Sequence, residues 1–380
     1  YLLAKRFFQH YATIIFVSLG AIATTYWGIE VSFFRLYYLI PLWLYFLIKF
    51  FDLYDFKYLW IVGIIAVISL IGNITYFAPL FLFIFVTFMF LLFMTRKDHA
   101  AFKVKNIFTP LSLGLLLLFF VLSFIYIDYV RQMFDYIKIY SSSRNPDGKI
   151  AMRTFLTYGA KTHVRSLLEF IYAIPFSTDF FIYIGLIPLV FLIYAVFHLR
   201  DVSRDNPVFI PLLIVSVMLI MFSLGAVGGI ATLLYYIVPG MSYFRHIGYV
   251  KIISKVLLLI ASGFGVDYYL MSARRYDSAD KENSKLKKYS PVNIGIVLVG
   301  LIVIVNITIF ILKFKTNKII YPLNNYLSYQ FHLFSIFILV LFCYFLLKQF
   351  NNKRIISYVI VTFYFIEIVS YCFVMSYSLP

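Results

Sequence analysis

A group of cationic residues interrupts the apolar C-terminal half of the chain. Arg245 and His246 stand side by side after a Pro-Gly pair at 239–240, and Lys251 and Lys255 follow, one helical turn apart, at the start of a long apolar run. Arginine offers phosphate a planar fork of donors, and lysine offers a point charge. These residues predict either a site for a phosphate-bearing lipid or an interfacial anchor whose cations reach lipid headgroups.

Carboxylates in the polar segments supply candidates for a general base, which needs a carboxylate within hydrogen-bond reach of an acceptor hydroxyl. Glu30 and Asp128 are the better candidates because each lies beside the end of a predicted span. Asn73, in a tight turn, is a candidate substrate contact. Alternatively, each acid is a solvated or salt-bridged loop residue. The remaining acids of the same predicted face are Asp135, Asp147, Glu169 and Asp179.

Several residues with reactive or polar side chains fall inside apolar runs. Glu367 is a functional candidate because acids within a membrane are costly, and pairing with a polar group of a neighbouring helix explains it equally well. Asn306 predicts a hydrogen bond between helices. Cys343 and Cys372 are expected to be small core residues and not a disulfide or metal pair. No metal-binding residues are predicted.

The composition places the chain among membrane proteins. It is 63% hydrophobic, 21% aromatic and 13% charged, with a mean hydropathy of +0.92. A soluble protein of this composition would leave too much apolar surface in water. The net charge of +17 comes from loops between apolar runs, a pattern typical of contact with anionic lipid headgroups. We therefore expect membrane lipids as partners and no nucleic acid.

Repeated apolar runs of about 20 residues predict an all-α, polytopic membrane protein with about eleven transmembrane helices. The chain, 1–380, is expected to form one membrane domain and to be a piece of a longer protein. One long outer loop, about 128–178, contains an amphipathic part at 150–172 that predicts an interfacial helix packed over the outer face. The predicted spans are 11–27, 33–51, 58–72, 76–94, 107–127, 179–198, 208–224, 250–270, 291–313, 332–347 and 355–375.

Lysine and arginine in the short loops set the predicted orientation, because such residues concentrate on the cytoplasmic side. The segments 95–106, 199–207 and 271–290 are rich in them and are assigned to the cytoplasm. The N-terminus of the chain is then cytoplasmic and the C-terminus extracytoplasmic. The outer face collects the long loop and the candidate residues Glu30, Asn73, Arg245 and His246.

Several stretches together resemble the YfhO-type bacterial membrane proteins, a branch of the GT-C superfamily of polyprenyl-phosphate-sugar-dependent glycosyltransferases. The resemblance extends over most of the chain in order and spacing. The stretches are 23–30 (ATTYWGIE), 37–42 (YYLIPL), 72–77 (GNITYF), 183–189 (YIGLIPL), 240–246 (GMSYFRH) and 263–267 (GFGVD).

The resemblance implies a GT-C-like helical domain with an active site at the outer face and a sugar donor on a polyprenyl phosphate. Arg245 is the implied phosphate contact. The family's catalytic acid is expected upstream of Tyr1 and is assigned to no residue here. Some relatives use a divalent cation, so a requirement for one stays open here. The sequence itself contains no carboxylate cluster that argues for a metal ion.

We therefore expect a glycosyltransferase of the bacterial plasma membrane that moves a sugar from a polyprenyl-phosphate carrier to an acceptor of the cell envelope. A transporter or flippase for lipid or polysaccharide is the alternative from another class. A non-catalytic membrane subunit is a third possibility. The sequence leaves the sugar, the acceptor and the oligomeric state open.

Overall fold

The computed structural model describes eleven stretches of the chain, and within them the regular secondary structure is helical, without a β-strand. An all-helical fold was predicted from the apolar runs, and the described residues confirm it. The described stretches are 1–26, 35–70, 78–95, 108–140, 149–157, 162–171, 183–243, 247–275, 290–316, 326–347 and 353–378.

The helices follow the predicted apolar runs in order along the chain. They are α1 (Leu2–Phe7), α2 (Tyr11–Tyr26), α3 (Arg35–Leu53), α4 (Phe56–Leu70), α5 (Ala78–Thr95), α6 (Pro110–Tyr140), α7 (Met152–Thr157), α8 (Leu186–Phe197), α9 (Leu199–Asp205), α10 (Phe209–Ser223), α11 (Ile230–Ile237), α12 (Lys251–Arg275), α14 (Pro291–Thr316), α15 (Tyr326–Leu347) and α16 (Lys353–Ser378). Three short 3₁₀ segments lie between them: η3 (Val164–Phe170), η4 (Met241–Tyr243) and η5 (Ile247–Val250).

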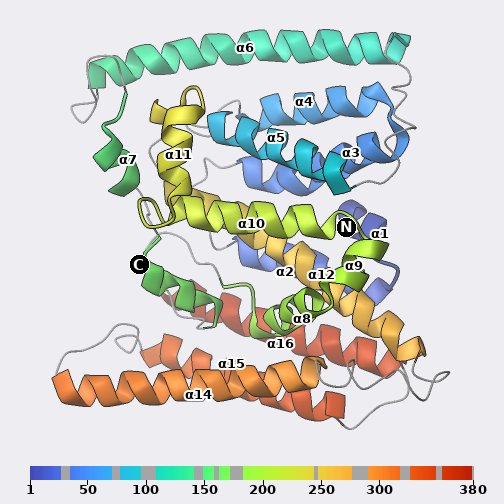
Figure 1. Cartoon of the computed structure of the whole chain (residues 1–380), viewed down its shortest axis with the longest axis vertical. Helices are drawn as coiled ribbons and strands as arrows, with labels where there is room; N and C mark the ends of the chain where they lie inside the picture. Colours follow the sequence, from blue (N-terminus) through green and yellow to red (C-terminus); the bar gives the residue numbers. More distant parts are fainter. Residues whose placement is uncertain are drawn as a thin grey trace.

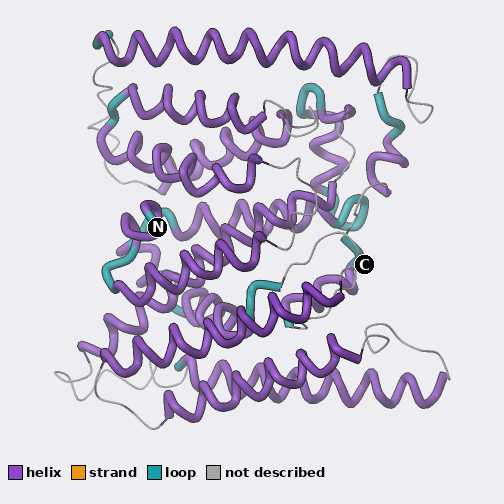
Figure 2. Tube along the Cα trace, turned by 180° about the vertical axis from the view of Figure 1, so that it is seen from behind, coloured by secondary structure: helices purple, strands orange, loops and turns teal. Residues whose placement is uncertain are grey.

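The long helices run across the longest axis of the molecule and are stacked one after another along it (Figures 1 and 2). Helix α6 lies at one end of the stack, and α14 and α15 lie at the other. Helix α12 lies in the middle and packs against α8, α10 and α2. Of an 18-residue apolar stretch within Lys251–Ser272, 89% is buried inside the molecule, whereas 6% of such a stretch within Pro110–Gln132 of α6 is buried. Helix α12 is therefore the core helix, and α6 is peripheral.

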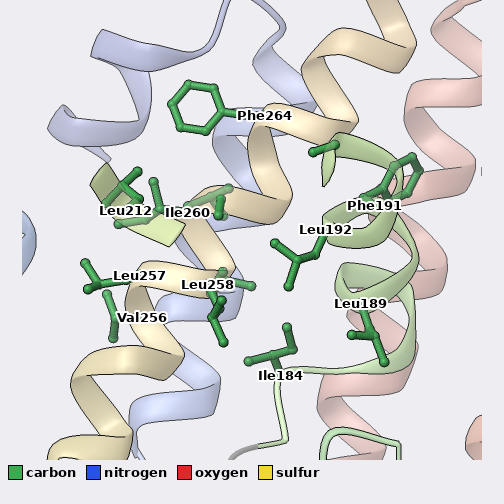
Figure 3. Packing of buried hydrophobic residues seen from close by; sticks show 14 of the residues in the cluster. Ile184, Leu189, Phe191, Leu192, Leu212, Val256, Leu257, Leu258, Ile260 and Phe264 are labelled. Carbon is green, nitrogen blue, oxygen red and sulfur yellow. The ribbon is translucent and has the colours of Figure 1, made fainter. Parts of the chain in front are cut away.

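The core around α12 is built from aliphatic side chains that point to both of its flanks. Leu257 lies on the side of Leu212 from α10, while Leu258 points toward Leu192 of α8 and Ile184 just before it (Figure 3). All five of the side chains concerned belong to one buried cluster. The stretch Val256–Val266 of α12 has no charged residue, so burial on all flanks is the arrangement that its sequence favours there.

Four described helices are long and apolar enough to cross a membrane: Pro110–Gln132, Lys251–Ser272, Pro291–Thr308 and Arg354–Cys372. Helices α8 and α9, bent by 89° at the break between them, would make a fifth span. These helices indicate a membrane-spanning protein. Other predicted spans also form helices, but their apolar parts are shorter, such as Phe56–Ser69 and Phe209–Ser223. Eleven spans, and the predicted orientation, stay predictions.

Helix α6 extends well beyond the predicted end of the fifth span at residue 127. It continues to Tyr140 and so includes the first part of the segment assigned to the long loop. The polar residues there suit an exposed helix: Gln132 donates a hydrogen bond to Asp128 one turn earlier, at 2.9 Å. No proline or glycine occurs between Asp128 and Tyr140 to end the helix.

Helix α8 begins at Leu186, whereas the span was predicted to start at 179. Residues 179–182 lie outside the described residues, and 183–185 are not helical. Gly185 precedes the helix with φ 106° and ψ 148°, a region of backbone conformation that is essentially restricted to glycine. A Cβ atom at this position would approach the Glu367 carboxylate to 3.0 Å. This glycine therefore lets the chain turn into the helix close to α16.

The segment predicted as an amphipathic helix at 150–172 contains two short helices, α7 and η3, separated by 158–161, which lie outside the described residues. Its ends pack on the region around α11. Tyr235 donates a hydrogen bond to the Ile150 carbonyl at 2.7 Å, and the Thr162 N–H donates to the Ser223 carbonyl at 3.0 Å. Phe155 also contacts the Tyr235 ring, at 5.1 Å between centroids. A position in the membrane interface stays a prediction.

The opposite end of α12 is tied to the N-terminal region. Asp267 accepts hydrogen bonds from the backbone N–H groups of Gln9 and His10 at 3.2 and 3.0 Å, and from the Thr13 hydroxyl at 3.3 Å. These groups lie at the start of α2, where backbone donors have no partner within the helix. The aspartate therefore caps α2 from another helix.

The remaining polar prediction within the apolar runs concerns α14. Asn306 Nδ2 donates to the Ile302 carbonyl at 2.9 Å and lies 3.3 Å from Nε2 of His332 on α15. The predicted hydrogen bond between helices is confirmed. Cys343 is buried, Cys372 is half-buried, and both are free thiols.

Candidate functional site

The candidate site lies at the start of α12. The chain reaches it through Gly240, whose φ of 82° suits a residue without a side chain, and through η4 and η5. Lys251 and Lys255 then occupy the first two turns of α12, with 0% and 3% of their surfaces exposed. Residues four apart lie on the same face of a helix, so the two ammonium groups enter the interior together.

A carboxylate from the long loop joins the two lysines. Glu169 of η3 has 0% of its surface exposed and interacts electrostatically with Lys255. Lys255 Nζ also lies 5.7 Å from the centroid of the Tyr371 ring of α16, within the range of a cation–π contact. We call Lys251, Lys255, Glu169 and Tyr371 the α12 charge cluster. Three elements far apart in sequence, η3, α12 and α16, thus meet at one site.

Packing of η3 places Glu169 in the interior. The apolar neighbours Leu168 and Phe170 are partly covered, and Phe170 packs against the main core. On the N-terminal side of η3, the hydrogen bond from the Thr162 N–H holds the backbone to the end of α10. The carboxylate is therefore fixed by the path of the loop and not by a long regular helix.

A second buried acid, Glu367, lies in α16 beside the start of α8. Its Oε1 accepts hydrogen bonds from the Tyr183 hydroxyl at 2.7 Å and the Leu186 N–H at 2.6 Å, and its Oε2 accepts one from the Ile187 N–H at 3.3 Å. The first backbone donors of a helix have no partner within it, and they favour a negative charge. The pairing interpretation of Glu367 is thus the one that the contacts support.

The two buried acids are linked through aromatic rings. The Tyr183 ring lies 5.3 Å from that of Tyr371, centroid to centroid. Tyr183 binds Glu367, and Tyr371 belongs to the α12 charge cluster. The packed pair of Tyr183 and Tyr371 therefore lies between the two acids.

The predicted site residues divide into two groups by where they fall. Lys251 and Lys255 lie together in the α12 charge cluster. Glu30, Asn73, Arg245 and His246 lie outside the described residues, so their roles stay predictions. The position of Arg245, between η4 and the start of η5 in the chain, is adjacent in sequence to the cluster.

Asp128 lies apart from the α12 charge cluster. It is exposed on α6 and accepts a hydrogen bond from Gln132. Helices α4 and α5 lie between α6 and the central helices in Figure 1. The structure does not bring this carboxylate beside Lys251 or Lys255, and its proposed role as a base stays a prediction.

The sequence places Glu169 among the predicted outer acids but favours Glu30 and Asp128 as bases, because these two lie close to span ends. Closeness to a span end says nothing about the path of a loop. One available signal was the apolar setting of Glu169, which is flanked by Leu168 and Phe170. An acid in such a setting is buried more readily than Asp147, which follows a proline in a predicted turn.

The α12 charge cluster has the chemistry of an anion-binding site. Two buried ammonium groups can stabilise a phosphate or a developing negative charge, and a carboxylate can accept a proton from a hydroxyl. Among the described residues, no group of three or more His, Cys, Asp or Glu side chains is placed to hold a metal ion.

Comparison with known proteins finds no relative: no family model matches the chain, and neither the curated proteins nor the solved structures contain a match. The likeness to YfhO-type proteins therefore remains a resemblance in the stretches quoted above.

Proposed function

We propose that this protein is a membrane transferase that binds a lipid-linked phosphate at the α12 charge cluster and moves the attached sugar to an acceptor hydroxyl. The observation that carries the proposal is the burial of Lys251 and Lys255 beside Glu169. The sequence resemblance supplies the donor class, a sugar on a polyprenyl phosphate, and the location, the outer side of a bacterial plasma membrane.

The charge of the cluster favours an anionic ligand. Its described residues are two lysines and one glutamate, so its net charge is +1 when all three are ionised. Removing an ion from water costs several kcal/mol even after the protein relaxes. Ionisable residues inside membrane proteins are therefore rare and typically mark substrate or ion sites. A phosphate is the anion that a lipid-linked donor would bring.

The proposed reaction is a displacement at the anomeric carbon of the sugar. The acceptor hydroxyl oxygen forms a bond to this carbon, and the bond from the carbon to the phosphate oxygen breaks. The lipid phosphate leaves with the electron pair, and Lys251 and Lys255 stabilise its charge. We assign the general-base role to Glu169, which takes the acceptor proton, because it is the carboxylate beside these lysines.

The first test is binding of a polyprenyl phosphate to the protein in nanodiscs. Lys255→Met removes the ammonium group and keeps an unbranched apolar side chain, so we expect about 10- to 100-fold weaker binding, the scale of a charge-assisted hydrogen bond. Lys49→Met is the matched control, because Lys49 Nζ also lies over a tyrosine ring, 4.9 Å from the Tyr45 centroid, but on α3. Normal binding by Lys255→Met would contradict the proposal, and weak binding counts for it only where the variant is still folded at the temperature of the measurement.

The second test is the reaction itself. Protein in proteoliposomes that contain a polyprenyl-phosphate-linked sugar should transfer the sugar to a soluble acceptor, and Glu169→Gln should abolish transfer while leaving donor binding measurable. Transfer at the wild-type rate by Glu169→Gln would remove the base role from Glu169. The donor-binding measurement separates this result from a loss of fold.

A transporter of lipid-linked material is the second candidate, and one observation favours it. The 89° break between α8 and α9, with Glu367 at the start of α8, resembles the broken helices that bind substrates in secondary transporters. A fluorescent polyprenyl phosphate that crosses the bilayer in proteoliposomes, without any sugar transfer, would favour transport. Transfer without lipid movement would favour the transferase.

A further inference from the structure

The polar face of the η3 region points inward, the reverse of an ordinary loop helix. Thr162, Ser166 and Glu169 have at most 1% of their surfaces exposed, whereas Val164 is 56% exposed. Three residues make one turn of a 3₁₀ helix, so Ser166 and Glu169 lie one above the other on the same face. This segment therefore buries hydroxyl and carboxyl groups and leaves a β-branched apolar side chain outside.

Within the part of the chain that the structure describes, neither buried hydroxyl, Thr162 Oγ1 or Ser166 Oγ, has a hydrogen-bond partner. By contrast, the buried Ser216 and Ser262 hydroxyls donate to carbonyls of their own helices, at 2.6 and 2.7 Å. A buried hydroxyl without a partner costs free energy, so a short segment that retains two of them calls for a ligand or bound water.

The same face of η3 meets the lysines of α12. Glu169, directly above Ser166 on this face, interacts with Lys255. Thr162 is held at the end of α10 by the hydrogen bond from its N–H to Ser223. Helix α10 in turn packs along α12, where the Ser254 hydroxyl donates to the Ser216 carbonyl at 2.9 Å. These contacts hold the two ends of the η3 region, at Thr162 and Glu169, to α10 and to Lys255 of α12.

We infer that Thr162 and Ser166 are ligand contacts that donate hydrogen bonds to the phosphate bound by Lys251 and Lys255. This inference deepens the proposed function and rests on it. Phosphate oxygens accept several hydrogen bonds at once, and hydroxyl donors beside ammonium groups satisfy that demand. The shared chemistry is a phosphate ester or free phosphate, and Glu169 remains available for the acceptor hydroxyl.

The test compares variants that remove each hydroxyl with little change in shape. Thr162→Val and Ser166→Ala are titrated with a polyprenyl phosphate in nanodiscs, beside wild type and Lys255→Met. Ser262→Ala is the matched control, because its buried hydroxyl is satisfied by the Leu259 carbonyl within α12. We expect about tenfold weaker binding for each hydroxyl variant and no change for the control.

Two further probes identify the source of the phosphate. Nanodiscs of phosphatidylglycerol offer a phosphate diester headgroup, and inorganic phosphate offers the free ion. If inorganic phosphate competes with polyprenyl phosphate for wild type, and this competition is lost in Thr162→Val and Ser166→Ala, the inference holds for a free phosphate. If only polyprenyl phosphate binds, and the two variants bind it more weakly, the inference holds for the lipid-linked donor.

The outcomes separate this inference from the proposed function. Tight binding by both hydroxyl variants, with weak binding by Lys255→Met, overturns the role of Thr162 and Ser166 and leaves the lysine site standing. A higher melting temperature of Ser166→Ala with unchanged binding also overturns it, because the hydroxyl then has only a structural role. No binding of any of these probes by wild type overturns the proposed function and this inference with it.

Discussion

Glu367 and Tyr183 form a hydrogen bond of 2.7 Å in the buried interior, although 184 positions separate them in the sequence. The same carboxylate accepts the N–H groups of Leu186 and Ile187, the first donors of α8. One side chain of α16 thus fixes both the start of α8 and the tyrosine that precedes it. This arrangement accounts for an acid within an apolar helix without a catalytic role.

Glu367→Gln should destabilise the protein by about 2–3 kcal/mol, because a carboxylate that accepts hydrogen bonds at both oxygens is replaced by an amide with one acceptor. The free energy of unfolding in mixed detergent measures the change. Tyr183→Phe is the control and should cost less, about 1 kcal/mol, since it removes a single hydrogen bond. A Gln variant as stable as wild type would show that Glu367 does not hold α8.

Gly185→Ala tests the turn that brings α8 to Glu367. The backbone at Gly185 has φ 106° and ψ 148°, and an added Cβ would lie 3.0 Å from the carboxylate. We expect a loss of about 1–3 kcal/mol from this strain. Gly114→Ala in α6 is the matched control, because a Cβ there meets nothing within 4 Å, and alanine should be neutral or slightly stabilising. Equal effects of the two substitutions would contradict the strain at Gly185.

The sequence predicts the helices well and their partners poorly. The predicted span 250–270 corresponds to α12, Lys251–Arg275, because a long apolar run with no proline has no alternative to a helix in a membrane. The end of α6 was missed by thirteen residues, at Tyr140 and not 127, because polar helix formers continue the helix after the apolar run stops. Hydropathy marks where a run is apolar and not where its helix ends.

The candidate site was predictable only in part, for the same reason. Lys251 and Lys255 stand out in the sequence because cations are rare in apolar runs. Their partner Glu169 does not, since its burial depends on how a loop with two short helices folds back over α12. The partners of Glu367 were equally hidden, because a carboxylate that caps a distant helix leaves no local pattern.

Asp267→Asn tests how the C-terminal part of α12 holds the N-terminal region. The carboxylate accepts from the Gln9 and His10 N–H groups and from the Thr13 hydroxyl. Substitution should cost about 1–2 kcal/mol, as the loss of a helix cap does. The change should be local, with faster hydrogen exchange at 9–13 and an unchanged rate across α12. Thr13→Val, which removes one of the three donors, should show a smaller effect. Uniformly faster exchange in the whole protein would argue against a local cap.

The last prediction concerns the coupling between Glu169 and Lys255, which a double-mutant cycle measures directly. Glu169→Gln and Lys255→Met should each destabilise the protein by about 3–5 kcal/mol, because each leaves a buried charge without its partner. The double variant should cost less than the sum of the two, by about 1 kcal/mol or more, because no unpaired charge of this pair remains.

The exposed pair of Arg6 and Asp52 is the control cycle. Their side chains are 48% and 21% exposed, so their coupling should stay below about 1 kcal/mol. The free energies of unfolding of all variants are measured in the same detergent, so that the two cycles are comparable. Strict additivity at Glu169 and Lys255 would mean that the two charges do not act on each other. We expect strong coupling in the Glu169–Lys255 cycle and not in the control cycle. If this coupling becomes smaller when a polyprenyl phosphate is bound, the lipid phosphate shares the positive charge of Lys255 with the carboxylate.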